Sequence, residues 1–340
     1  MSSLKIIGGE HIIDPDALNK RINRFEMPQF SLGRTCLYAI LTSLQKDISC
    51  LLLPDYLCYS VAEVPLRINM PITHYHISSD FLPDYEDIRK KANENTGELG
   101  ILLISYFGMV DLNRTIQSIR QEYPDIIIIV DDVQNYFGFG KHIDFDYCFT
   151  SYRKWFEVPD GADILQKNDD VKLECCYHGD PEYASYKVAG NLLKNNTEMI
   201  GDSISLEMLE KGEKMMDESY LYSCSEIGRS LYQRIDTRLA AKKRKSNAEY
   251  LHKGLQRLNI EHLFDSSRIP LFIPIIHKNR DQIRKVLFAD NVFPPVHWPV
   301  MNVAAQGNNE LYNVELSLIC DQRYDVEDMD RILRGIENAL

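Results

Sequence analysis

The sequence lacks several features that mark whole classes of protein. None of its eight cysteines forms a C-x-x-C pair, and neither the cysteines nor the nine histidines fall at zinc-ligand spacing, so we expect no metal site. No run of about 18 apolar residues is present, which argues against a membrane-spanning helix. Residues 1–15 show neither the basic start nor the apolar run of a signal peptide. Scattered thiols are typical of a reducing compartment, so we expect a cytoplasmic protein.

Positive charge is also in short supply. The chain has 38 Lys and Arg against 50 Asp and Glu, and its net charge of -12 disfavours a nucleic-acid partner, which needs a basic surface. Small anionic ligands remain compatible, because they need only one local pocket. What is present is an ordinary globular balance of 44% hydrophobic and 26% charged residues over 340 positions, enough for about two domains.

The first half alternates short apolar runs with amphipathic stretches. The runs are Leu51 to Leu53, Ile101 to Tyr106, Ile126 to Val130 and Tyr147 to Ser151. Continuous apolar runs of this length are typical of strands buried on both faces of a parallel sheet. Between them, 36–44 and 112–123 carry apolar stripes at helical spacing. This alternation predicts an α/β domain with a mainly parallel sheet between helices.

The second half changes character. Residues 208–258 read as helical, and they are followed by a strand (271–277), a helix (281–290), a strand (315–320) and a closing helix (326–340). Pro274 indicates a sheet edge, because proline cannot donate to a ladder. We therefore predict a large domain over residues 1–215 and a smaller C-terminal α+β domain over residues 216–340.

Three candidate sites follow these strands or open a helix. Asp131 and Asp132 come directly after the apolar run 126–130, where a carboxylate is costly to bury without a cationic partner. Lys154 follows the next strand. Gly33 and Arg34 open the helix over 36–44, where free amides favour an anion. Each has a plainer explanation: a turn acid, a solvated loop lysine and an ordinary glycine before a helix.

Taken together, the three candidates have a more specific meaning. Ligands of an open parallel sheet bind at the carboxyl ends of its strands, so these groups are expected to meet there. An amine, a carboxylate and a phosphate-sized anion site are what pyridoxal 5'-phosphate (PLP) requires. Ser151 and Lys154 also form the Ser-x-x-Lys spacing of serine acyltransferases, but the partner motifs of those enzymes are absent.

The sequence resembles the sugar aminotransferases of the DegT/StrS type, which have the aspartate-aminotransferase-like fold. The matching segments run in order through most of the chain: Gly33 to Leu37, Pro54 to Tyr59, Asp131 to Gln134, Arg153-Lys154 before Gly161-Ala162, and Leu316 to Tyr324. The resemblance implies PLP as cofactor, type I fold for PLP-dependent transferases, and a homodimer.

The resemblance also implies a role for each residue. Lys154 would form the Schiff base and move protons, Asp131 would face the pyridine nitrogen, and Gln134 would bind the ring's 3-hydroxyl. Arg34 and Thr35 would supply backbone amides to the phosphate, with the Thr35 hydroxyl as a further candidate. Either Tyr56 or Tyr59 would stack on the ring. Asp132 competes with Asp131 for the ring nitrogen, and the spacing to Gln134 favours Asp131.

Three positions depart from the family pattern. The usual phosphate-binding serine, five residues before the lysine, is Phe149, and Ser151 is the expected substitute. The usual Gly-Gly pair is Gly161-Ala162, and a proline near the end is Ile319. No copy of the loop that reaches the partner subunit's phosphate is evident.

The implied reaction is transfer of an amino group, with glutamate as donor and a nucleotide-linked keto sugar as acceptor, in sugar or polysaccharide biosynthesis. Two alternatives stay open: a PLP enzyme of another reaction type, and a non-catalytic protein of this fold with a regulatory or assembly role.

Two further segments are candidates either for substrate contact or for a purely structural role. The basic cluster 242–245 is either a solvated helix face or a nucleotide contact, and His297-Trp298 either lines the substrate mouth or packs at an interface.

Overall fold

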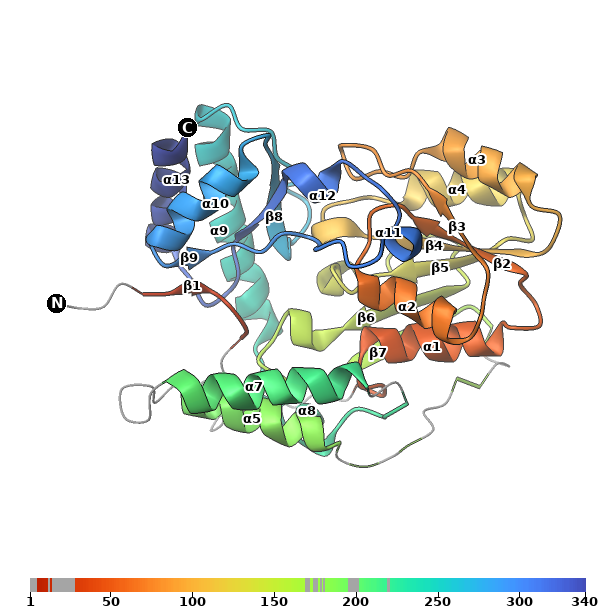
Figure 1. The fold of residues 1–340 in the computed structure, drawn as a ribbon, viewed down its shortest axis with the longest axis horizontal. Coiled ribbons are helices and arrows are strands. Elements are labelled where there is room, and N and C mark those ends of the chain that lie inside the picture. The colour runs from red at the N-terminus through yellow and green to blue at the C-terminus, as the bar shows by residue number, and fades with distance from the viewer. Residues whose placement is uncertain are drawn as a thin grey trace.

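The structure is a computed structural model that describes residues 5–11, 13, 28–168, 172–173, 177, 179, 181–194, 202–218 and 221–340. Figure 1 shows two lobes, with the sheet of the larger one running through its centre. Two of the eight cysteines, Cys175 and Cys176, lie outside the described residues, and the other six are free thiols. Within the described part of the chain, no helix is both long and apolar enough to cross a membrane.

A six-stranded sheet organises the large lobe. Its strands stand in the order β3 (Ile72–Tyr75), β2 (Cys50–Pro54), β4 (Leu99–Ile104), β5 (Ile127–Asp131), β6 (Tyr147–Ser151) and β7 (Ala162–Gln166). The first five are parallel and β7 runs antiparallel to β6. The predicted α/β architecture with a mainly parallel sheet is therefore confirmed. All four predicted strands are present, while β3 and β7 were not predicted.

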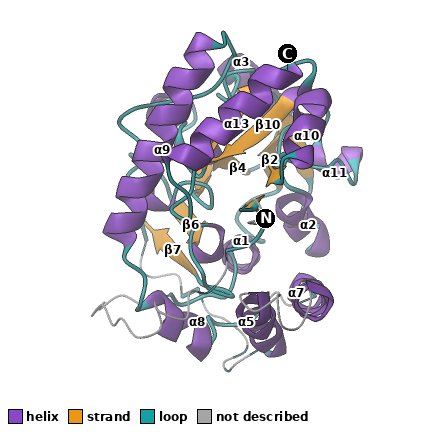
Figure 2. Cartoon of the chain, turned by 90° about the vertical axis from the view of Figure 1, so that its left-hand side faces the viewer, coloured by secondary structure: helices purple, strands orange, loops and turns teal. Residues whose placement is uncertain are grey.

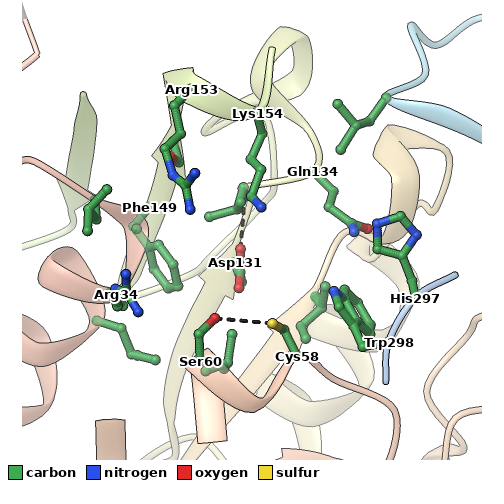
Figure 3. Close-up of a pocket in the computed structure, with 18 of the residues that line it drawn as sticks. Arg34, Cys58, Ser60, Asp131, Gln134, Phe149, Arg153, Lys154, His297 and Trp298 are labelled. Atoms are coloured by element: carbon green, nitrogen blue, oxygen red, sulfur yellow. Dashed lines mark hydrogen bonds between the residues drawn. The ribbon is translucent and has the colours of Figure 1, made fainter. Parts of the chain in front are cut away.

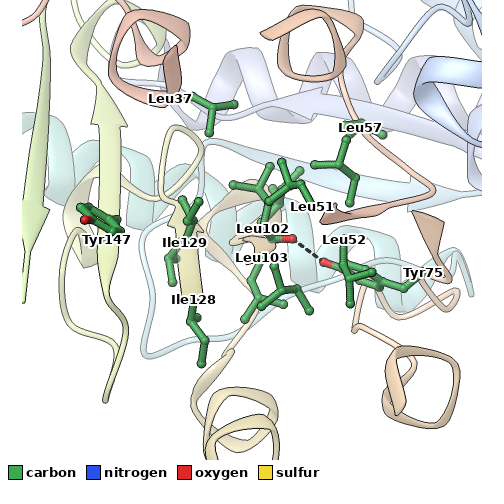
Figure 4. Close-up of a cluster of buried hydrophobic side chains, with 14 of the residues drawn as sticks. Leu37, Leu51, Leu52, Leu57, Tyr75, Leu102, Leu103, Ile128, Ile129 and Tyr147 are labelled. Carbon is green, nitrogen blue, oxygen red and sulfur yellow. Dashed lines mark hydrogen bonds between the residues drawn. The ribbon is translucent and has the colours of Figure 1, made fainter. Parts of the chain in front are cut away.

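Helices cover both faces of this sheet. Figure 1 shows α1 (Gly33–Ser43) and α2 (Tyr59–Arg67) on one side, and α3 (Tyr85–Glu94) and α4 (Asn113–Glu122) on the other. The predicted apolar stripe of α1 is fully buried at Leu37, Ile40 and Leu41. It packs on the leucines and isoleucines of β2, β4 and β5 (Figure 4). Burial of each such side chain contributes about 1.5–3 kcal/mol to the free energy of unfolding.

The second lobe has its own core. Strand β8 (Phe272–Ile276) pairs antiparallel with β10 (Glu315–Ile319), and helices α9 (Thr237–Arg257), α10 (Arg280–Ala289) and α13 (Val326–Ala339) pack on them. The short strands β1 (Ile7–Gly8) and β9 (Val292–Phe293) pair beside it. These elements match the predicted order, and Asp325 caps α13. The division between residues 215 and 216 stays a prediction.

Three helices that follow the sheet form a separate layer, which lies along one side of the molecule in Figures 1 and 2: α5 (Glu182–Lys194), α7 (Asp202–Asp217) and α8 (Glu226–Tyr232). The helical stretch predicted over 208–258 is thus broken between α7 and α8 and again before α9. Asp160 anchors this layer. Its buried carboxylate accepts hydrogen bonds from Ser225 N, Ser225 Oγ and Tyr183 Oη at 2.8–3.0 Å. Two further short α-helices of the described residues are α11 (Val303–Gln306) and α12 (Leu311–Val314).

Side chains from the second lobe hold the turn that carries Lys154. Gln322 donates from Nε2 to Trp155 O at 2.7 Å, and its Oε1 accepts from Arg244 Nε at 2.7 Å. Arg244 is fully buried and lies over the Trp155 ring at 4.7 Å. The solvated-face interpretation of the basic cluster is therefore wrong for Arg244 and right for its three lysine neighbours, which are exposed. The helix turns Arg244 inward, opposite to the side that the lysines share.

Candidate active site

A cavity of about 450 Å³ opens at the carboxyl ends of the central strands, within the range typical of ligand sites. The last residues of β4, β5 and β6 (Ile104, Asp131 and Ser151) line it from the sheet. The start of α1 lines one side, and the segment 295–298 of the second lobe lines another. Figure 3 shows the side chains that project into it. The cavity thus lies where an open parallel sheet is expected to bind ligands.

Lys154 reaches this cavity from a short 3-10 turn, Tyr152–Lys154, that follows β6. The next residue, Trp155, is fully buried and donates from Nε1 to Val133 O at 2.9 Å, which fixes the turn against the end of β5. The Lys154 ammonium is open to the cavity rather than packed. The positive charge of Arg153 and partial enclosure by protein lower the pKa of Lys154. A lowered pKa increases the fraction of neutral, nucleophilic amine.

Asp131 faces Lys154 across the cavity (Figure 3). Its Oδ1 accepts a hydrogen bond from Val133 N at 2.8 Å, and only 4% of the residue is exposed. Burial raises the pKa of Asp131 to about 7, helped by the neighbouring Asp132, while the Val133 amide and the Lys154 ammonium pull it back. A positive charge placed beside this carboxyl would favour its ionised form.

The competing carboxylate, Asp132, points to the other side of the strand and does not line the cavity. Its oxygens contact His142 Nε2 at 2.9 and 3.1 Å, Cys148 Sγ at 3.1 Å and Asn135 Nδ2 at 2.9 Å. Side chains alternate between the two faces of a strand, so only one of two successive acids can enter the site. Of the two candidates, Asp131 alone has access to a ligand in this cavity.

Gln134 also lines the cavity, from the loop after β5. Its Oε1 accepts a hydrogen bond from Phe107 N at 2.8 Å. With the oxygen held by this main-chain amide, the NH₂ group is the end that can donate to a ligand. Asp131 and Gln134 therefore offer an acceptor and a donor from one short segment.

The predicted phosphate ligands are only partly brought together. Arg34 and Ser151 line the cavity, whereas Thr35 does not. The Thr35 hydroxyl is buried and bonded to Ser31 Oγ at 2.9 Å. Ser151 Oγ lies 3.5 Å from Gly161 O, a long contact that leaves the hydroxyl weakly held. Phe149, which stands at the usual serine position, lines the cavity with a ring and offers no hydrogen-bonding group.

Neither tyrosine of the predicted stacking pair lines the cavity. Tyr56 is fully buried, donates to His297 O, and packs against the Trp298 ring with centroids 5.2 Å apart. From the same segment, Cys58, Ser60 and Val61 line the cavity instead. The choice between Tyr56 and Tyr59 stays open. The aromatic groups that do line it are Phe149, Phe272, His297 and Trp298. His297 and Trp298 thus line the cavity, while Trp298 also packs against Tyr56, so both interpretations of this pair stay predictions.

Three charged residues of the cavity were not among the predicted site residues: Arg153, Glu213 and Asp217. Arg153 Nη2 lies 3.2 Å from Glu213 Oε1, and Arg34 Nη1 lies 2.8 Å from Asp217 Oδ1. The adjacent guanidinium of Arg153 holds the pKa of Glu213 well below its usual range, although partial burial opposes this effect. Arg153 could have been found from its place beside Lys154. The two acids lie on α7 and carry no local sequence signal.

A second cavity, of about 510 Å³, adjoins the first and shares Arg153, Lys154 and Glu213 with it. The second lobe contributes Arg284 and Arg323 to its wall. Arg323 is paired with Asp321 at 2.7 Å, whereas Arg284 donates to Pro294 O and lies over the Phe288 ring. Lys154 therefore lines both cavities.

Across the described ranges, no cluster of three or more His, Cys, Asp or Glu side chains is arranged to hold a metal.

Comparison with known proteins identifies the fold of this chain. No family model matches the sequence, and no curated protein matches it. Solved structures do. An aminotransferase from Helicobacter pylori, PseC, involved in the biosynthesis of pseudoaminic acid, matches with a TM-score of 0.68 at 13% identity, over 98% of this chain and 99% of its own.

Two further structures agree. A DegT/DnrJ/EryC1/StrS aminotransferase from Brucella abortus matches with a TM-score of 0.62 at 14% identity, over 96% of this chain and 91% of its own. NtdA from Bacillus subtilis, solved with bound cofactor PMP, matches with a TM-score of 0.62 at 17% identity, over 95% and 74%. This chain has the aspartate-aminotransferase-like fold. The predicted type I fold of PLP-dependent transferases is thereby confirmed over nearly the whole length.

Proposed function

We propose that this chain is a PLP-dependent sugar aminotransferase of the DegT/StrS type. The observation that carries the proposal is the placement of the Lys154 amine and the Asp131 carboxylate in one cavity at the carboxyl edge of the sheet. The fold shared with structures named as aminotransferases supports it. One of these structures was solved with PMP, the amine form of the same cofactor.

The side chains of the cavity have the chemical groups that this cofactor needs. The Lys154 amine can bind its aldehyde carbon, the buried Asp131 carboxylate can face its ring nitrogen, and the Gln134 amide can donate to its ring hydroxyl. Arg34, Ser151 and the first turn of α1 would hold its phosphate. When bound, the cofactor supplies an electron-accepting ring that stabilises negative charge on the substrate carbon next to nitrogen.

Each protein group then has a defined task. With the cofactor bound, Lys154 Nζ would be the base and acid that moves a proton at the substrate carbon, and its lowered pKa suits that task. Asp131 would have a cationic neighbour in the ring nitrogen. This ion pair would stabilise the ionised carboxylate, which would in turn keep the ring nitrogen protonated. A hydrogen bond from Trp155 Nε1 to Val133 O joins the segments that carry Lys154 and Asp131, so it fixes the position of one side chain relative to the other.

The substrates we propose are glutamate as amino donor and a nucleotide-linked keto sugar as acceptor, within sugar or polysaccharide biosynthesis. Both carry negative charge, which Arg284 and Arg323 of the second cavity can attract without making the protein basic as a whole. His297 and Trp298 offer a polar and an apolar surface to a sugar ring at the mouth of the first cavity.

A homodimer and a cytoplasmic location complete the proposal. The loop that follows the cavity residue Trp298, together with the first residue of α11, exposes three apolar side chains, Val300, Met301 and Val303, at 44%, 74% and 57%. Adjacent exposed apolar side chains of this kind are typical of surfaces covered by a partner. A second copy of the chain over this loop would bury these residues and close the cavity. Sedimentation of the wild-type chain and of a Met301→Asp variant tests the dimer.

Covalent trapping of the cofactor tests the central claim. We expect PLP added to the purified chain to give a visible absorption band that borohydride abolishes, with the reduced cofactor recovered on the peptide that contains Lys154. The Lys154→Ala variant should lose both signals, and the Lys141→Ala variant, which alters an exposed lysine outside this cavity, should keep them. Recovery of the cofactor on another lysine would refute the assignment.

A second experiment separates transamination from other uses of the cofactor. Glutamate added to the cofactor-loaded chain should replace the absorption band of the lysine-bound aldehyde by that of the amine form. A panel of nucleotide-linked keto sugars should then restore the first band. An unchanged spectrum with every amino donor would favour a non-catalytic protein of this fold over an aminotransferase.

A further inference from the structure

Two arginines enter the cavity at the same end. Arg34 comes from the first turn of α1 and Arg153 from the turn before Lys154, and both lie on the Phe149 side of Asp131 in Figure 3. The Arg34 side chain is 8% exposed and that of Arg153 is 20% exposed. Phe149 offers no donor between them. Their guanidinium groups are therefore the strongest donors at this end of the site.

Helix α7 supplies the counter-ions of both arginines. Glu213 and Asp217 are one helical turn apart on that helix and lie opposite Arg153 and Arg34, at 3.2 Å and 2.8 Å. Glu213 is shared, because Lys187 Nζ of α5 also contacts it at 2.8 Å. The arginines are fixed by the large lobe, whereas the carboxylates belong to the helical layer that packs beside it.

The two sides of these ion pairs differ in exposure. The Glu213 and Asp217 side chains are 39% and 62% exposed, several times more than their arginine partners. The Asp217 carboxylate faces water, so it gains little from its pair and loses little when it is released, whereas Glu213 is held more strongly, as its lowered pKa shows. A guanidinium enclosed by protein depends more on an anion. A phosphoryl group, with several acceptor oxygens and up to two charges, matches a pair of planar guanidinium forks better than two single carboxylates do.

We propose that Arg34 and Arg153 form a two-arginine fork for a phosphoryl group, and that Glu213 and Asp217 are exchangeable counter-ions that occupy the fork when no phosphoryl group is there. If the proposed function holds, the phosphoryl group is that of PLP, and the fork takes the place of the hydroxyl that Phe149 cannot provide. Phosphoryl binding then releases the two carboxylates, while Arg34 Nη2 keeps its hydrogen bond to Met216 O at 3.0 Å. The same chemistry would accept the diphosphate of a nucleotide.

A comparison of two aldehydes isolates the phosphoryl contribution. PLP and pyridoxal form the same bond with Lys154, but only PLP carries a phosphate, so the ratio of their dissociation constants reports on the fork. The ratio is measured by titrating the cofactor-free chain and following the visible absorption. In Arg153→Gln or Arg34→Gln, we expect PLP to bind about 10- to 100-fold more weakly while pyridoxal binding changes little.

The carboxylates are tested in the opposite direction. Removing the competing charges in a Glu213→Gln/Asp217→Asn variant should tighten PLP binding relative to pyridoxal by about three- to tenfold. Glu210→Gln, an exposed change on the same helix outside the cavity, is the matched control and should leave the ratio unchanged. Both carboxylates are at least 39% exposed, and the buried Lys187 keeps Glu10 as a partner at 2.5 Å, so we expect this variant to fold even if an arginine variant does not.

Three outcomes overturn the proposal: an unchanged PLP-to-pyridoxal ratio in both arginine variants, weaker PLP binding in the double carboxylate variant, or an equal effect of Glu210→Gln. If the wild-type chain binds neither aldehyde at Lys154, the proposed function fails and the fork is tested with inorganic phosphate and a nucleoside diphosphate. A rise in melting temperature that Arg153→Gln abolishes then supports the fork with that ligand. No rise with either compound refutes it.

Discussion

The carboxyl group of Asp131 should lower the stability of the cofactor-free chain at neutral pH. Burial raises the pKa of Asp131 to about 7, against an ordinary value of 3.8. In the unfolded chain this carboxyl loses its proton above about pH 4, whereas in the folded chain it keeps the proton until about pH 7. The folded state thus binds more protons between these pH values, and stability falls as pH rises through this window. The change Asp131→Asn removes this cost, and its amide oxygen can still accept from Val133 N.

The size of the effect follows from the two pKa values. A difference of about three pKa units at 1.36 kcal/mol each gives an upper limit of about 4 kcal/mol at about pH 8, where the folded carboxyl is ionised. At about pH 5 the folded carboxyl is still protonated, and the cost is roughly 2 kcal/mol. The variant should therefore be more stable than the wild type at both pH values, with a gap about twice as large at the higher one.

Urea denaturation of the cofactor-free protein at both pH values measures this gap. Asp125→Asn is the matched control, because Asp125 is an exposed carboxylate just before the same strand. The control should change the free energy of unfolding by less than about 0.5 kcal/mol. A variant Asp131→Asn that is no more stable than the wild type at about pH 8, or whose advantage does not grow with pH, would refute the reasoning. PLP should shrink the gap, because it places a cation beside the wild-type carboxylate.

Three further changes should lower stability by separate mechanisms, each measurable as a shift of the urea midpoint. Gly108→Ala places a side chain at φ +72°, with its Cβ 2.9 Å from two carbonyl oxygens, and should cost about 2 kcal/mol. Arg244→Met removes the buried guanidinium that donates to Pro270 O, Leu271 O and Gln322 Oε1 and should cost about 3 kcal/mol, whereas a shift below about 1 kcal/mol would mean that these bonds contribute little. Asp160→Ala removes the acceptor for Ser225 and should cost about 3 kcal/mol, with protease cleavage beginning in the α5–α8 layer; cleavage elsewhere first would contradict the anchoring role.

The parallel core of the fold was predictable because burial on both faces leaves a plain signal. Strands β2, β4 and β6 are buried at every residue, and their sequences are correspondingly apolar. Strands β3 and β7 lie at the two edges of the sheet and are only half-buried. Edge strands tolerate polar residues such as His74 and Asp163, so their sequences resemble those of loops.

The candidate site was predictable where chemistry sits beside a strand end. Asp131 and Lys154 follow two neighbouring strands, so the sheet itself brings them together. Contacts between distant segments left no such signal. Thr35 is turned away by a hydrogen bond to Ser31, and Tyr56 is drawn into an aromatic cluster with Trp298, which neighbours it only in the folded chain. Glu213 reaches the cavity through helix packing, which no local pattern encodes.

The pairing of β1 with β9 has a consequence for how the protein is made. Ile7 belongs to the core of the second lobe, and its strand partner is Val292, so a segment that precedes the six-stranded sheet in the chain waits for one that follows it. The wall formed by 295–298 also arrives late. A nascent chain can therefore assemble the six-stranded sheet and expose Lys154 before the second lobe exists to cover it. Closure of this cavity therefore follows synthesis of the second lobe, and removal of β1 should disturb the core of that lobe as loss of α13 does.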